Sequence, residues 1–154
     1  MNAEDFFAIH NLIYSYCDCL DRGDFNGMAN LFANADFYVP SHPQPLTGPA
    51  EIVAAYRENV RIYPQTGTPR TRHITTNVMI ESDGPDAART QSYFIVFQAT
   101  DRAPLQPIIG GRYFDRFVRL DGRWRFKERR IDCDLFGDLS AHLLKTFGPT
   151  PQAD

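Results

Sequence analysis

The stretch that decides the fold is GRYFDRFVRLDGRWRFKERR, residues 111–130. Apolar and charged residues alternate on both sides of its central Asp121-Gly122. This dipeptide between two alternating runs is a strong signal for a two-residue hairpin turn, because both residues tolerate positive φ. The sequence therefore predicts two antiparallel strands, one from Ile108 to Leu120 and one from Arg123 to Cys133.

The predicted turn also fixes which residues of the hairpin face each other. It places Phe117 opposite Phe126 and Tyr113 opposite Arg130. Buried charges need partners or a ligand, so we expect Arg130 and Tyr113 to point inward and to meet a carboxylate or a bound polar group. An internal ion pair without a catalytic role, or a bulge that turns these residues outward, is the alternative. Period-two alternation assigns to the core side Tyr113, Asp115, Phe117, Trp124, Phe126, Glu128 and Arg130.

The opposite face of the hairpin is also rich in apolar side chains. Phe114, Val118, Leu120 and Ile131 are interleaved with arginines there. A sheet face of this kind is too apolar to be wholly solvated. We therefore expect a homo-oligomer, a dimer or a trimer.

The rest of the chain changes period midway. Helical spacing dominates before Tyr63, and strand-like alternation dominates after Thr71. Helices followed by a meander of strands indicate an α+β fold, with helices packed on one face of an antiparallel sheet. The remaining predicted elements are a helix over Asp5 to Leu20, a short helix after Asp24, a strand over Asp36 to Pro40, a helix starting at Pro49, and strands over Thr71 to Glu81 and Ala88 to Ala99.

Composition limits the function classes. With 154 residues, 43% of them hydrophobic and 13% aromatic, the chain fits one domain with a real core. The net charge of −3 with mixed signs provides no basic field for nucleic acid and no polybasic run for a membrane surface. The first residues lack the regions of a secretory signal, and no apolar run is long enough to span a bilayer, so we expect a cytoplasmic protein.

The motifs of several common chemistries are missing. The chain has no phosphate loop, dinucleotide fingerprint, nucleophile-elbow serine or His-Glu-x-x-His metal motif. Cys17 and Cys19 lack the nearby ligands of a zinc site, and an odd total of three cysteines argues against a disulfide framework. We therefore expect neither a metal nor a cofactor. Polar residues set in apolar patterns remain as candidates, namely Tyr16, Asp21, Tyr38 and His73.

A resemblance to a known family covers nearly the whole chain. It rests on IYSYCDCLDRGDF (13–25), LTGPAEI (46–52), RHITTNV (72–78) and the hairpin at 111–126. These motifs, in this order and spacing, resemble the SnoaL-like group of the nuclear transport factor two superfamily. The resemblance implies a single SnoaL-like domain over residues 1–154. It also implies a cone-shaped, curved antiparallel sheet, an α+β barrel, with the N-terminal helices on its concave face and a pocket between them for a small apolar cyclic ligand.

Within that group the chain is most similar to the scytalone dehydratase and bile-acid dehydratase branch. Tyr16, Asp21 and His73 match the pocket-lining Tyr, Asp and His of that branch, which implies cofactor-independent acid–base catalysis on a hydroxylated cyclic or aromatic molecule. An Asp-oriented imidazole can accept a proton next to a carbonyl, and a phenol can polarise that carbonyl or help a hydroxyl leave. The expected substrate-binding residues are Tyr38, Asn77, Tyr93, Tyr113 and Arg130.

One departure from the branch and two rival functions stand beside this hypothesis. Scytalone dehydratase uses a second histidine from a later strand, where this chain offers Tyr93 and Gln98, and this counts against scytalone itself as the substrate. A proton transfer of the ketosteroid-isomerase or polyketide-cyclase type would use the same pocket and base. A non-catalytic ligand-binding or assembly subunit, similar to the small subunit of aromatic-ring dioxygenases, would share the fold without the chemistry. For His73 taken alone, a surface position is the plainer interpretation.

Overall fold

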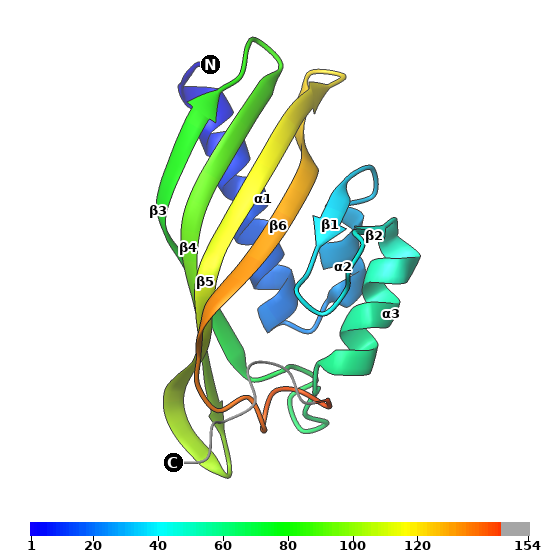
Figure 1. The fold of residues 1–154 in the computed structure, drawn as a ribbon, viewed down its shortest axis with the longest axis vertical. Helices are drawn as coiled ribbons and strands as arrows, with labels where there is room; N and C mark the ends of the chain where they lie inside the picture. Colours follow the sequence, from blue (N-terminus) through cyan, green and yellow to red (C-terminus); the bar gives the residue numbers. More distant parts are fainter. Residues whose placement is uncertain (146–154) are drawn as a thin grey trace.

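The structure is a computed structural model, and residues 1–145 are described. Figure 1 shows long strands crossing the N-terminal helix, with a third helix to one side. No helix among the described residues is long and apolar enough to cross a membrane. The elements are α1 (Ala3–Asp21), α2 (Phe25–Asn30), β1 (Asp36–Tyr38), β2 (Leu46–Thr47), α3 (Pro49–Asn59), β3 (Thr71–Ser82), β4 (Ala87–Thr100), β5 (Ala103–Leu120) and β6 (Arg123–Phe136).

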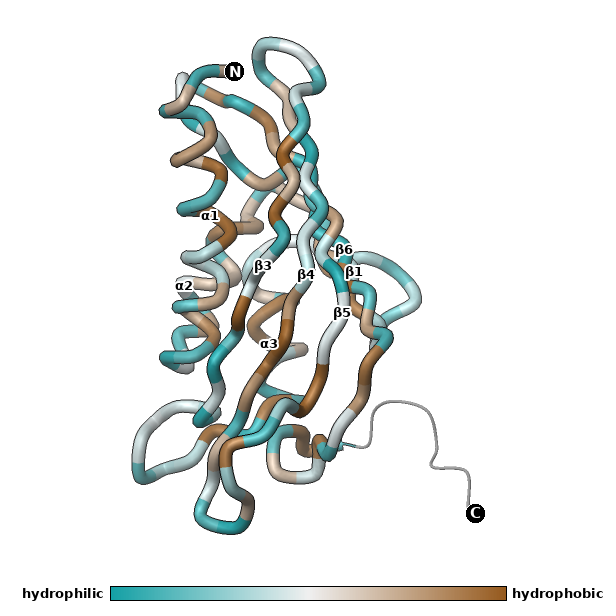
Figure 2. The backbone as a smooth tube through the Cα atoms, turned by 90° about the vertical axis from the view of Figure 1, so that its left-hand side faces the viewer, coloured by the Kyte–Doolittle hydropathy of each residue, from teal (hydrophilic) through white to brown (hydrophobic). Residues whose placement is uncertain are grey.

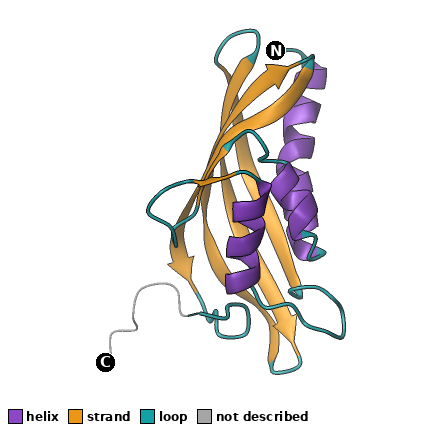
Figure 3. Ribbon diagram, turned by 90° about the vertical axis from the view of Figure 1, so that its right-hand side faces the viewer, coloured by secondary structure: helices purple, strands orange, loops and turns teal. Residues whose placement is uncertain are grey.

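The strands form one curved six-stranded sheet in the order β2-β1-β6-β5-β4-β3. Its four long strands are antiparallel, whereas the short β1 runs parallel to β6, so the sheet is mixed. The sheet is unclosed, with β2 and β3 at its edges. Figure 3 shows the helices on one face of this sheet. The α+β fold predicted from the sequence, with helices packed on a curved sheet, is confirmed.

Local signals in the sequence explain where the helices begin and end. Asn2 and Asp5 form a reciprocal capping box at the start of α1. Gly23 follows the end of this helix with a φ of +74°, a backbone conformation that favours glycine. A Cβ atom at this position would also lie only 2.6 Å from the carbonyl oxygen of Gly67, so no larger residue fits. Asp24 then caps α2 by accepting a hydrogen bond from the amide of Gly27, and Pro49 occupies the first turn of α3.

The core lies between the helices and the sheet. Ile9, Ile13, Met28 and Phe32 of the helical segment are fully buried, as is Phe37 of β1. Figure 2 shows hydrophobic stretches of the long strands at the level of α3. The part of the molecule between α3 and the sheet is therefore largely apolar, which suits a site for an apolar molecule.

The hairpin keeps the predicted turn but not the whole predicted register. Asp121 and Gly122 both have positive φ, and Phe117 pairs with Phe126 as expected. Beyond that pair the register shifts at Lys127, so that Arg116 faces Glu128 and Tyr113 faces Ile131. This is a β-bulge, which inserts one extra residue in one strand and exchanges the faces of the residues that follow, here up to a second register shift after Cys133.

The bulge overturns the expected position of Arg130. Its side chain is half exposed and lies over the ring of Tyr38, 3.8 Å from the ring centre. Glu128 is likewise partly exposed, 3.8 Å from Arg130. The prediction that Arg130 points inward is therefore wrong, and Ile131, expected on the outer face, lines the interior instead.

The inward-facing arginine is Arg129. Its guanidinium donates two hydrogen bonds of 2.7 Å to the carboxylate of Asp115, and both side chains are completely buried. It also lies 4.2 Å from the ring centre of Tyr16 and 4.3 Å from that of Tyr113. Although burial lowers the pKa of Arg129, the Asp115 carboxylate more than offsets this, so the pKa is raised and the guanidinium stays charged. The sequence correctly predicted an arginine inside the sheet. Because the bulge adds one residue at Lys127, that arginine is Arg129 and not Arg130.

Candidate active site

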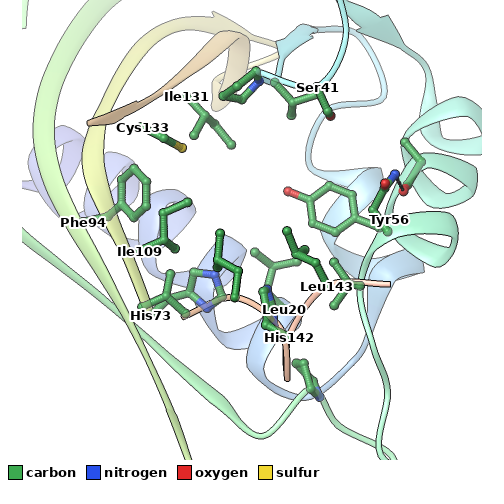
Figure 4. A pocket seen from close by; sticks show the side chains of 18 of the residues that line it. Leu20, Ser41, Tyr56, His73, Phe94, Ile109, Ile131, Cys133, His142 and Leu143 are labelled. Atoms are coloured by element: carbon green, nitrogen blue, oxygen red, sulfur yellow. Dashed lines mark hydrogen bonds between the residues drawn. The ribbon is translucent and has the colours of Figure 1, made fainter. Parts of the chain in front are cut away.

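A cavity of about 170 Å³ lies between the sheet, the helices and the segment that follows β6. Its walls are mostly apolar, with Phe94 and Val96 from β4, Ile109 from β5 and Ile131 from β6. Figure 4 shows these side chains around an empty centre, with a few polar groups among them. The polar side chains that line it are Tyr16, Ser41, Tyr56, Asn59, His73, Tyr113, Cys133 and His142.

The most ordered polar group in the cavity wall is the pair of Asp21 and His73. Asp21 is the last residue of α1, and His73 lies near the start of β3. The Nδ1 atom of His73 is 2.6 Å from Oδ1 of Asp21, and both side chains are about nine-tenths buried. A carboxylate can only accept here, so Nδ1 carries the proton and Nε2 is left as the acceptor.

The carboxylate of Asp21 is held by more than the imidazole. The backbone amide of His73 donates to Oδ2 at 2.8 Å, and the hydroxyl of Thr71 donates to Oδ1 at 2.8 Å. Burial raises the pKa of Asp21, but the hydrogen bonds and charge of His73 and the hydroxyl of Thr71 lower it further, leaving it below its ordinary value of 3.8. Asp21 is therefore an ionised, fixed acceptor that sets the orientation of the ring.

Two phenols face the imidazole from the helical side. The hydroxyls of Tyr16 and Tyr56 are 3.0 Å apart, and Tyr56 lies across the cavity from His73 with its hydroxyl directed inward (Figure 4). Burial raises the pKa of Tyr16 well above its ordinary value and raises that of Tyr56 to about 12. Both phenols therefore keep their protons. One hydroxyl donates to the other in their mutual contact, which leaves one hydroxyl proton for an oxygen of a bound molecule.

Four of the residues selected from the sequence meet at this site. Tyr16, His73 and Tyr113 line the cavity, and Asp21 contacts His73 from behind. Tyr113 is buried and stacks on Phe94, with ring centres 4.4 Å apart. Tyr113 keeps its predicted inward position because the extra residue of the bulge is in β6, whereas Tyr113 lies on the partner strand β5.

The other four do not line the cavity among the described residues. Tyr38 lies under Arg130, and Tyr93 is 37% exposed beside Arg112. Asn77 is exposed at a second bulge, in β3, where its φ is +52°. The bulges in β6 and β3 are the physical reason for the misplacement of Arg130 and Asn77, because a one-residue insertion cannot be read from alternation.

Sequence reasoning missed five of the polar residues that line the cavity within residues 1–145, namely Ser41, Tyr56, Asn59, Cys133 and His142. Tyr56 has the spacing of a core residue on α3, and nothing in the sequence separates that role from a cavity-lining one. His142 follows the last strand in a segment without regular structure, so no periodicity could assign it a face. Within residues 1–145 no group of three or more His, Cys, Asp or Glu side chains is placed to bind a metal ion.

Sequence comparison gives the family. The family model described as SnoaL-like domain matches residues 1–130. The chain belongs to the SnoaL-like domain family. This confirms the resemblance drawn from the sequence motifs, and the nuclear transport factor two superfamily with it. No curated protein matches the chain.

Solved structures extend the likeness to nearly the whole chain. Rv3472 of Mycobacterium tuberculosis, a protein of unknown function, is 27% identical, with a TM-score of 0.70 over 86% of this chain and 78% of that one. A protein of Novosphingobium aromaticivorans described as a "Putative Scytalone Dehydratase" is 23% identical, with a TM-score of 0.69 over 98% and 96%. A second protein of that organism, described as a "putative aromatic ring hydroxylase", is 22% identical, with a TM-score of 0.71 over 92% and 98%. At these identities the last two show a shared fold.

Proposed function

We propose that this SnoaL-like protein is a cofactor-independent dehydratase or isomerase that acts on a small hydroxylated cyclic or aromatic molecule. The observation that carries the proposal is the 2.6 Å contact between Asp21 and His73 in the wall of an apolar cavity. An imidazole held in one tautomer by a buried carboxylate, with its other nitrogen free, is the arrangement that a general base requires.

The proposed reaction begins with proton removal. Nε2 of His73 takes a proton from the carbon next to a carbonyl of the substrate, and the electron pair of the broken C–H bond moves to the carbonyl oxygen. Asp21 stabilises the imidazolium that forms. In a dehydration, the enolate then expels a hydroxyl from the neighbouring carbon, which leaves as water with the proton that His73 held. In an isomerisation, His73 returns the proton to another carbon.

The cavity limits the size of the substrate. An engineered apolar cavity of about 150 Å³ holds benzene, so a volume of about 170 Å³ suits a molecule built on a single ring. The pair of Tyr16 and Tyr56 has one hydroxyl proton beyond their mutual hydrogen bond, and it can donate to an oxygen of the substrate. We therefore propose monocyclic β-hydroxy ketones and related cyclic enones as the substrate class.

A substrate screen tests this proposal. Purified protein is incubated with a panel of hydroxylated cyclic ketones and enones, and loss of water or movement of the double bond is followed by ultraviolet absorbance and mass spectrometry. We expect turnover of at least one compound, and loss of that turnover in His73→Ala. Turnover that persists unchanged in His73→Ala, or a panel that shows binding without any reaction, would count against catalysis.

A second function, as an assembly or ligand-binding subunit, is favoured by the outer face of the sheet. Ile74, Met79 and Ile95 are each more than a third exposed there, as is Leu135 of β6. An exposed apolar face of a sheet is a surface that another chain can cover. Light scattering after size exclusion tests this point. We expect a homo-oligomer at micromolar concentration, which Ile95→Glu dissociates, and a monomeric wild type would contradict it.

A further inference from the structure

The cavity contains a second imidazole, from a part of the chain that the proposed mechanism does not use. His142 lines the same cavity as His73 and is 9% exposed. Figure 4 shows the two histidines on the same side of the cavity, with Tyr56 across from them.

The segment that carries His142 is fixed to the rest of the domain. We call residues 137–145 the C-terminal strap. The amide of Arg61 donates to the carbonyl of His142 at 2.8 Å, and the amide of Leu144 donates to the carbonyl of Asn59 at 2.8 Å. The hydroxyl of Tyr63 donates to the carbonyl of Ala141 at 2.6 Å. These bonds on both sides of His142 hold its backbone in place, which a group that must meet a ligand requires.

The ring of His142 has an unmet hydrogen-bonding capacity. Its Nδ1 atom is buried and has no hydrogen-bond partner within residues 1–145. Buried polar atoms in folded proteins nearly always have a partner, so the protein itself does not satisfy the ring of His142, which lines the cavity. By contrast, Nδ1 of His73 is fully engaged by Asp21.

The two imidazoles also differ in their charge. Burial, together with the charge of His73 and despite that of Asp21, lowers the pKa of His142 to about 4. At neutral pH His142 is therefore an uncharged ring with one N–H group. A neutral imidazole can polarise a carbonyl by hydrogen bonding without giving up its proton. The nearby polar and titratable side chains that line the cavity are Tyr16, Tyr56, His73, Tyr113 and Cys133.

We propose that His142 is a second substrate-contacting residue, whose neutral imidazole hydrogen-bonds the carbonyl oxygen of the substrate while His73 removes the adjacent proton. This inference rests on the proposed function. The proton and the carbonyl oxygen sit on neighbouring atoms of a ketone, which fits two imidazoles on one side of the cavity. The hydroxyl of Tyr56, across the cavity, is then left to hydrogen-bond another oxygen of the bound molecule.

The probe for this contact is 4-nitrophenol, a single ring whose oxygen becomes an anion like that of an enolate and whose colour reports its ionisation. We measure its affinity and its ionised fraction when bound to wild type, His142→Phe and the control His10→Phe. His10 lies on α1, outside the cavity lining. Since hydrogen bonds to charged groups are the strong ones, we expect His142→Phe to weaken binding roughly tenfold and to lower the ionised fraction. His10→Phe should behave as wild type.

Nuclear magnetic resonance of the wild-type histidine rings gives a readout that needs no variant. The ring signals of His142 should stay those of a neutral imidazole over about pH 5 to 8 and should shift when 4-nitrophenol binds. A His142 ring that protonates in this range, an absence of nitrophenol binding by the wild type, or a His142→Phe variant with unchanged affinity and ionisation would overturn the proposal.

The outcome separates this inference from the proposed function. If a panel substrate is turned over in a His73-dependent way while His142→Phe leaves nitrophenol binding and ionisation unchanged, only the role of His142 falls. If nitrophenol binding depends on His142 but no panel compound reacts, His142 is a ligand-binding residue and the catalytic proposal falls.

Discussion

Within residues 1–145, two pairs of buried, oppositely ionisable side chains differ in how they are built. Arg129 and Asp115 are completely buried, and rings of Tyr16 and Tyr113 pack against the guanidinium. The side chains of His73 and Asp21 are about a tenth exposed, and His73 lines the cavity with Asp21 behind it. The first pair is enclosed by protein, whereas the second has one ring nitrogen left for a ligand.

The difference shows what makes a buried charge a candidate for chemistry. Both carboxylates accept hydrogen bonds of 2.6 to 2.7 Å from their partners, so short contacts alone do not distinguish the pairs. The pair of Arg129 and Asp115 cannot exchange its proton at any working pH, since the pKa of Arg129 is raised further by Asp115. The imidazole of His73 lines a cavity, where its second ring nitrogen can accept a proton from a bound molecule. We therefore assign stability to the first pair and proton transfer to the second.

The strongest test of this assignment is His73→Ala. We expect turnover of a substrate from the panel to fall roughly a hundredfold to ten-thousandfold, the usual contribution of a positioned general base. The variant should still fold with a moderately lower melting temperature, because Asp21 loses the hydrogen bond from the ring but keeps those from Thr71 and the backbone amide of residue 73. Steady-state kinetics and thermal unfolding are measured on the same samples, with His10→Ala as the matched control. If the variant lost its fold together with its activity, the role of His73 would be structural.

The converse test removes the charge of Asp115. Asp115→Asn leaves Arg129 buried without a counter-charge, so we expect a loss of about 3–5 kcal/mol in the free energy of unfolding. Urea unfolding measures it. The double variant Asp115→Leu with Arg129→Met should recover much of this loss, because an apolar pair needs no desolvation of charge. If Asp115→Asn were as stable as wild type, the enclosed pair would not be the stabilising one.

The contrast between the pairs also shows what the sequence can predict. The helices, the long strands and the Asp121-Gly122 turn follow from periodicity and capping, which are local. Asp115 was expected inside, but its partner was expected at Arg130, because alternation cannot reveal the extra residue at Lys127. The His73 and Asp21 pair was reached only through the family resemblance, since 52 residues separate them in sequence.

Polar groups supplied by helices and irregular segments were beyond prediction for a different reason. The alternation along a strand predicts which face of the sheet each residue occupies. The strap that carries His142 is neither strand nor helix, so its sequence has no such periodicity. Its position depends on bonds from Arg61 and Tyr63, which are remote in sequence. Such contacts are set by tertiary packing and leave no local pattern.

A smaller effect is expected for Asp21→Asn, which keeps the shape of the side chain and removes its charge. At metal sites, the partners that orient a histidine are worth roughly tenfold to a hundredfold in activity. By analogy we expect a loss of that size here, with nearly unchanged ligand binding. Measured kcat should fall while the affinity for 4-nitrophenol stays within a few fold. A variant with full kcat would show that Asp21 does not assist His73.

The same variant tests the pH dependence of stability. The pKa of Asp21 is lowered in the folded protein, so the folded state binds fewer protons than the unfolded state as the pH falls toward 3.8. The stabilisation from Asp21 is therefore present above its unfolded pKa and is lost as the pH falls through the folded value. Unfolding at a series of acidic pH values should show a steeper loss for wild type than for Asp21→Asn. Equal slopes would contradict the lowered pKa.

The smallest expected effect belongs to Tyr56→Phe, which removes one hydroxyl and leaves the ring in place. A single hydrogen bond contributes about 0.5–1.5 kcal/mol net, so we expect kcat/KM to fall roughly two- to tenfold. The hydroxyl of Tyr16, 3.0 Å from that of Tyr56, remains in the cavity wall and can take over part of the contact. Tyr14→Phe, on an exposed part of α1, is the matched control and should match wild type. A larger loss than that of Asp21→Asn would mean that a phenol, and not the oriented imidazole, is the main proton-handling group of the cavity.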